Sequence, residues 1–149
     1  MSTLNKKLMI SLEDSAMFIV LSHPKTYQLL NKILPAYDTE KKCPTAIGFF
    51  TVCVSFFSLN YLFMNLKKSN LSNGLMLKYS FWGTLLYFLV ANKETYKLVN
   101  NILPVANEEG CPNKMGLLVH GLVYFISLIG IMYFPDECNI NVQMSTIYF

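Results

Sequence analysis

The feature that most constrains the fold of this chain is an internal repeat. Residues 26–35 recur as residues 95–104, at an offset of 69, with seven of the ten positions identical. Further on, Cys43-Pro44 recurs as Cys111-Pro112, at an offset of 68. A repeat of this kind means that one structural unit occurs twice. The sequence predicts a tandem duplication with a first unit (1–69), a second unit (70–135) and a C-terminal tail (136–149).

The second apolar segment of each unit is long enough to cross a membrane. Residues 46–64 and residues 115–134 contain no charged side chain. Each run is close to the roughly 20 residues that a helix needs to cross about 30 Å of hydrocarbon. The alternative is a buried core helix, but a chain of 149 residues leaves little else to bury two such runs. Both segments are therefore predicted to span a bilayer.

The first apolar segment of each unit is less apolar. Residues 75–91 include Lys78, whose ammonium group can reach the membrane surface along its flexible stem. Residues 8–22 include Glu13 and Asp14, and each acid costs about 2.5–3.5 kcal/mol at a bilayer centre. Whether 8–22 spans fully is left open. The predicted fold is an all-α integral membrane protein, with four membrane-embedded helices arranged as two parallel-oriented helical hairpins.

A short polar helix is predicted between the two apolar segments of each unit. Its apolar residues recur every three to four positions, a pattern typical of a helix lying on an apolar surface, here the bilayer interface. Ser22 and Asn92 are candidate caps for its first turn. Pro35 and Pro104 end it, because proline cannot continue a helix without losing a backbone bond.

The composition argues against several functions. Hydrophobic residues make up 53% of the chain and charged residues 14%, whereas a soluble domain carries about a quarter charged residues. The net charge of +3 comes from twelve lysines against nine carboxylates, and without arginine nucleic-acid binding is not expected. The cysteine spacing fits no metal site, and no nucleophile–base pair or phosphate loop is present. We expect no enzyme activity and no cofactor.

Cys43 and Cys111 hold equivalent places in the two loops and are candidates for a disulfide. A bond between them requires that both loops face an oxidising compartment and lie together. The alternative is a pair of reduced thiols inherited by duplication.

His120, Asn60 and Glu13 are candidates for an intramembrane polar site. Ionisable groups within a membrane often mark relays or permeation paths. However, the position that matches His120 in the first unit is Val52, so no symmetric pair exists. A structural role, in which a neutral His120 bonds a neighbour, is the favoured interpretation.

The second unit resembles a known family. Its stretches Tyr-Lys-Leu-Val-Asn (96–100), Gly-Cys-Pro (110–112) and Met-Gly-Leu-Leu-Val-His (115–120) are similar to motifs of the small two-helix membrane proteins of nucleocytoplasmic large DNA viruses, the giant and algal viruses. Asn113-Lys114-Met115 stands where that family has Thr-Thr-Leu. The first unit lacks a glycine before Cys43 and a histidine at the position that matches His120. The resemblance implies a virion protein of the internal membrane that contacts the capsid layer, without catalytic residues.

The sequence thus leaves two functions open. The first is a structural membrane protein of a large DNA virus particle, capsid-associated, which organises the internal membrane and contacts capsid or other membrane proteins through its loops and tail. Its partners would be the lipid bilayer, these proteins and further copies of itself. The alternative is a small oligomeric ion channel or transporter, similar to a viroporin, with a path lined by His120, Asn60 and Glu13.

Overall fold

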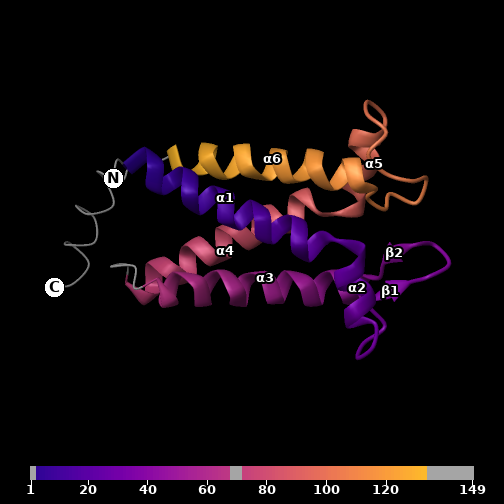
Figure 1. Ribbon diagram of the computed structural model, residues 1–149, viewed down its shortest axis with the longest axis horizontal. Coiled ribbons are helices and arrows are strands. Elements are labelled where there is room, and N and C mark those ends of the chain that lie inside the picture. Colours follow the sequence, from indigo (N-terminus) through magenta and orange to yellow (C-terminus); the bar gives the residue numbers. More distant parts are fainter. Residues whose placement is uncertain (1–2, 68–71, 134–149) are drawn as a thin grey trace.

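Four long helices lie side by side in this protein, whose computed structural model describes residues 3–67 and 72–133 (Figure 1). Helices α1 (Thr3–Ser22) and α4 (Asn73–Val90) run in one direction, whereas α3 (Ala46–Leu66) and α6 (Lys114–Tyr133) run in the other. Two short helices and a small β-hairpin gather at one end of this bundle. The predicted contacts of the tail, 136–149, lie outside the described residues.

The prediction of four membrane-embedded helices is wrong, because the part of the chain that the structure describes has two helices that could span a membrane. Within residues 3–67 and 72–133, only α3 and α6 are long and apolar enough to cross a membrane, as predicted for these two segments. Glu13 and Asp14 interrupt the apolar character of α1, and Lys78 with neighbouring polar residues lowers that of α4. The fold is also not purely helical, because strands β1 (Tyr37–Asp38) and β2 (Cys43–Pro44) form a two-stranded antiparallel sheet.

The long helices pack across the two predicted units rather than as separate hairpins. Helix α1 lies mainly against α6, and α3 lies mainly against α4. The contacts between α1 and α3, and between α4 and α6, are less extensive. Each long helix of the first predicted unit therefore packs more extensively on a helix of the second unit than on its neighbour in its own unit.

The short helices α2 (Pro24–Leu30) and α5 (Lys93–Asn100) follow α1 and α4. Asn92 caps α5, accepting a bond from the backbone of Glu94 at 3.0 Å. In the first unit the cap is His23 rather than Ser22, and its Nδ1 accepts from Lys25 at 3.1 Å. Ser22, the last residue of α1, is instead buried, and its hydroxyl is hydrogen-bonded to the hydroxyl of Tyr87.

A close backbone approach fixes the start of α3 and the start of α6. At Gly48 and Gly116 an added Cβ would collide with the carbonyl oxygens of Ala36 and Val105 respectively. The same two oxygens accept bonds from Thr45 at 3.0 Å and Asn113 at 3.1 Å. Only glycine leaves room for a loop to lie so tightly against the first turn of a helix.

Four aromatic rings, one from each long helix, fill the centre of the bundle: Phe18, Phe56, Tyr87 and Tyr124. Each is fully buried. Their centroids are 4.6 to 6.0 Å apart around the set, a range typical of stacked and edge-to-face pairs. Phe18 matches Tyr87 at the offset of 69, and Phe56 matches Tyr124 at 68. The core thus joins equivalent positions of the two units.

Candidate functional site

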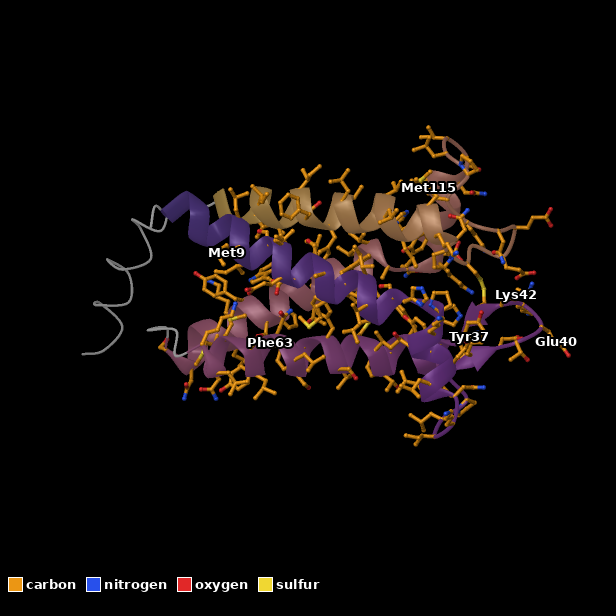
Figure 2. All side chains as sticks on the ribbon, in the orientation of Figure 1. Met9, Tyr37, Glu40, Lys42, Phe63 and Met115 are labelled. Atoms are coloured by element: carbon orange, nitrogen blue, oxygen red, sulfur yellow. A yellow bond between two sulfur atoms is a disulfide. The ribbon has the colours of Figure 1, made fainter. Side chains whose placement is uncertain are left out.

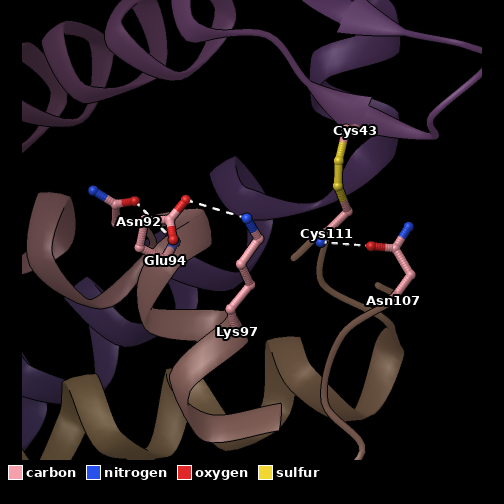
Figure 3. Close-up of polar contacts among 6 residues, drawn as sticks. All are labelled: Cys43, Asn92, Glu94, Lys97, Asn107 and Cys111. Carbon is pink, nitrogen blue, oxygen red and sulfur yellow. Dashed lines mark hydrogen bonds and ion pairs between the residues drawn. A yellow bond between two sulfur atoms is a disulfide. The ribbon is translucent and has the colours of Figure 1, made fainter. Parts of the chain in front are cut away.

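A disulfide joins the two Cys-Pro loops at the end of the bundle that carries α2, α5 and the β-hairpin (Figure 3). Cys43 and Cys111 are bonded, with Cα atoms 5.3 Å apart, within the range normal for a disulfide. The backbone N–H of Cys111 donates a hydrogen bond to Asn107 Oδ1 at 2.8 Å, which fixes the position of Cys111 in its loop. We call this end of the molecule, residues 36–45 and 104–113, the head.

The two loops of the head are built alike. Asp38 Oδ1 accepts bonds from Glu40 and Lys41, which turns the first loop tightly. Lys42 has a φ of 54° and its counterpart Gly110 has a φ of 81°, so both occupy the left-handed region. Figure 2 shows Glu40 and Lys42 at the tip of the first loop, beyond the ends of the helices. The tip of the first loop therefore presents charged side chains at the end of the molecule.

The two loops differ in charge. The first contains two acids and two lysines, Asp38, Glu40, Lys41 and Lys42, whereas the second contains Glu108 and Glu109 and no lysine. The amide of Asn107 reaches the carbonyl of Lys41 at 3.5 Å, so the loops also meet by this contact.

His120 is buried next to the head and contacts both α4 and α5. Its Nδ1 lies 2.8 Å from the carbonyl oxygen of Val90, which ends α4. Its ring stacks on Tyr96, with centroids 3.7 Å apart and planes inclined by 19°. Carbonyls of the last helical turn have no partner within their own helix. His120 therefore satisfies the end of α4 and fastens it to α6.

A second polar cluster lies beside it. The hydroxyl of Tyr87 meets that of Ser22 at 3.0 Å and is also bonded to the hydroxyl of Tyr27. Burial, reinforced by the neighbouring Tyr87, raises the pKa of Tyr27 well above its ordinary value. Burial likewise raises the pKa of Tyr96. Both phenols therefore stay neutral at physiological pH.

Three buried polar atoms have no partner within the described residues: Ser80 Oγ, Tyr96 Oη and His120 Nε2. Leaving a buried donor or acceptor unpaired costs about 1–3 kcal/mol. They come from α4, α5 and α6.

Asn60 and Glu13 lie in different surroundings from His120. Asn60 is buried against Gly83 of α4, and its Nδ2 is 3.4 Å from where a Cβ of that glycine would lie. Tyr124 donates to the carbonyl of the same glycine at 3.2 Å. Glu13 is half exposed and forms an ion pair with Lys67, which follows α3. The three residues predicted as one polar site are thus engaged by three separate sets of neighbours.

The sequence interpretation missed the partners of these residues. Tyr96 and its counterpart Tyr27 are identical in the two copies of the repeat, and both are buried. The pairing of Phe18 with Tyr87, and of Phe56 with Tyr124, could have been found from aromatic residues at the repeat offset. In residues 3–67 and 72–133, no cluster of three or more metal-ligating side chains is present.

Comparisons with known proteins give no match. No family model, no curated protein and no solved structure is similar enough to this chain to be matched. The resemblance of the second unit to small membrane proteins of large DNA viruses therefore stays a prediction from its motifs, as do the duplication and the absence of enzyme activity.

Proposed function

We propose that this chain is a structural membrane protein whose helices α3 and α6 span a bilayer and hold the disulfide-linked head at one surface. The observation that carries this proposal is the exposure of the two spans. Only 28% of the apolar 18-residue stretch of α3, and 33% of that of α6, is buried inside the protein. The core helix of a soluble protein would be mostly buried, whereas a lipid-facing helix keeps an apolar outer surface.

The outer faces of the two spans support the proposal. Large apolar side chains project from α3 and α6 along their length, as Figure 2 shows. They include Val54, Leu62, Phe63, Leu118, Leu122 and Ile126. A contiguous exposed surface of this kind marks contact with a membrane or another apolar partner.

The turns that follow α2 and α5 suit the boundary between lipid and water. Among the large apolar residues that the structure describes, Ile33 and its counterpart Ile102 are the most exposed, at 82% and 83% of their surface. Leu29 and Leu98 lie beside them and are also exposed. Two equivalent apolar projections on opposite sides of the head would anchor it at the interface, as interfacial helices do.

The disulfide bears on which surface the head faces. Disulfides persist in oxidising compartments and are rare where glutathione and thioredoxin keep thiols reduced. We propose that the head lies on the oxidising face of the membrane. On the resemblance alone, we propose that this membrane is the internal membrane of a large DNA virus particle and that the head contacts capsid or neighbouring membrane proteins.

The experiment is alkaline carbonate extraction of membranes that contain the chain, followed by cysteine labelling. In a background with Cys138→Ser, single probes are placed at Glu40→Cys in the head and Asn73→Cys at the start of α4. Both residues are exposed. The chain should stay in the pellet, and a membrane-impermeant maleimide should label only one probe in sealed vesicles. Release by carbonate, or labelling of both probes in sealed vesicles, would contradict the proposal.

No contact within the described residues favours the channel alternative. Aromatic rings fill the centre of the bundle, and His120 is bonded to Val90 and covered by Tyr96. Reconstituted liposomes test it directly. Ion or proton flux that appears with the wild-type chain and is lost with His120→Gln would favour the channel over the structural function.

A further inference from the structure

The face formed by α3 and α4 carries two adjoining hollows. One is lined by Phe57, Leu77, Lys78 and Phe81, with a volume of about 360 Å³. The other is lined by residues that include Val54, Phe57, Phe81 and Phe88, with a volume of about 290 Å³. Because Phe57 and Phe81 border both, the hollows form one groove. Its walls are mostly hydrocarbon and aromatic rings, with Cys53 and Thr84 among the lining residues and Lys78 near one end.

We propose that this groove binds one anionic phospholipid, with an acyl chain between α3 and α4 and the phosphate against Lys78. This inference rests on the proposed membrane function and goes beyond it, because it assigns a specific lipid site to one face. A second helix would also fit an apolar groove, but it would leave Lys78 without an anion. The charge at the end of the groove therefore favours a lipid.

The length of the groove agrees with an acyl chain in one leaflet. From Leu77 to Phe88 the α4 wall extends over 88 − 77 = 11 residue steps, or roughly 16 Å at 1.5 Å per residue. This is about half of the roughly 30 Å hydrocarbon core. Lys78 lies in the second turn of α4, at the end of the bundle away from the head. A chain that starts there would reach the middle of the bilayer.

The charge on Lys78 is available to a ligand. Lys78 is exposed and, within residues 3–67 and 72–133, forms no ion pair with a carboxylate, unlike Lys67, which pairs with Glu13. A lysine ammonium binds phosphate as a point charge through its three donors. Anionic headgroups would therefore be preferred over zwitterionic ones.

The corresponding face between α1 and α6 is built differently. Ile19, the counterpart of Phe88, packs directly on Gly121, 2.9 Å from where a Cβ would lie. The counterpart of Gly121 on α3 is Cys53, which borders the groove. The counterpart of Lys78 is Met9, which carries no charge. The α1–α6 face thus supplies a matched control within the same molecule.

The test is native mass spectrometry of the full chain titrated with phosphatidylglycerol or phosphatidylcholine in mild detergent. The wild-type chain should hold one phosphatidylglycerol about tenfold more tightly than phosphatidylcholine. Lys78→Gln should abolish this preference, and Val54→Trp should block binding of both lipids by filling the groove. Lys32→Gln, in the turn after α2, and Leu122→Trp, the counterpart of Val54 on α6, should leave binding unchanged.

Equal affinity for the two lipids, or an unchanged preference in Lys78→Gln, would overturn the lipid site. A cross-link between two copies through a photoreactive group at Val54 in membranes would also overturn it, since the occupant would then be a second chain. Carbonate extraction of the same preparations separates the two ideas. If the wild-type chain is extracted, the membrane function fails, whereas a chain that stays in the membrane without lipid preference refutes only the lipid site.

Discussion

The imidazole of His120 lies against the phenol of Tyr96, with ring centroids 3.7 Å apart, while its Nδ1 lies 2.8 Å from the carbonyl of Val90. One side chain thereby connects α6 to α5 and to the end of α4. We expect His120→Phe, which keeps a stacked ring but loses the bond, to destabilise the protein by about 1 kcal/mol. His120→Ala also leaves a cavity and should cost about 3 kcal/mol.

Denaturant unfolding in detergent micelles, followed by circular dichroism, measures both changes. Leu118→Ala, on the exposed face of the same helix, is the control and should change stability by less than about 0.5 kcal/mol. A finding that His120→Ala is as stable as Leu118→Ala would contradict the structural role assigned to this histidine.

The Cys43–Cys111 bond should hold the two halves of the chain together after they are cut apart. It closes a loop of 68 residues, for which the chain-entropy model gives a stabilisation of about 4 kcal/mol. With a protease site introduced between the units, the fragments should migrate together without reductant and separate with it. Cys111→Ser should separate them under both conditions, whereas Cys53→Ala should behave like the wild type. Comigration of fragments in Cys111→Ser without reductant would argue against this bond.

The glycines at the start of α3 and α6 should not tolerate a methyl group. In Gly116→Ala the new Cβ meets the carbonyl of Val105, so either the loop moves or its bond from Asn113 breaks. Overpacking of this type costs about 1–3 kcal/mol. Gly130→Ala is the matched control on the same helix, because nothing lies within 4 Å of its Cβ position. Equal thermal stability of the two variants would show that the loop has room to move.

The four central rings should dominate packing stability. Phe56→Ala removes a fully buried ring that contacts Tyr87 and Tyr124, and should cost about 3–5 kcal/mol. Phe63→Ala, on the exposed face of α3, removes the same atoms from the outer surface of the bundle and should cost far less. The comparison uses the midpoint of unfolding in micelles of one detergent. A similar loss in both variants would mean that burial in this bundle does not determine stability.

Much of the local structure could be predicted from the sequence. The uncharged runs identified the helices α3 and α6, since length and hydropathy are properties of a segment alone. The cap at Asn92 also depends on neighbouring residues only. The pairing of α1 with α6 could not be predicted in this way, because it depends on how side chains distant in sequence fit together.

The candidate site was predictable only in its components. The repeat offset placed Cys43 and Cys111 in equivalent loops, but their separation of 5.3 Å between Cα atoms follows from the packing of both units. His120 stood out as a lone ionisable residue in an apolar run. Its partners Val90 and Tyr96 come from other helices, so its structural contacts became visible only in the folded chain.

The packing of α1 on α6 and of α3 on α4 has a consequence for how the chain is made. During synthesis, α1 and α3 emerge before the helices against which they mainly pack, so the first half of the chain cannot complete its packing until the second half has been made. Either half produced alone would expose the faces that the other half normally covers. Residues 3–67 and 72–133 therefore cover each other's packing faces, as the two subunits of a dimer do.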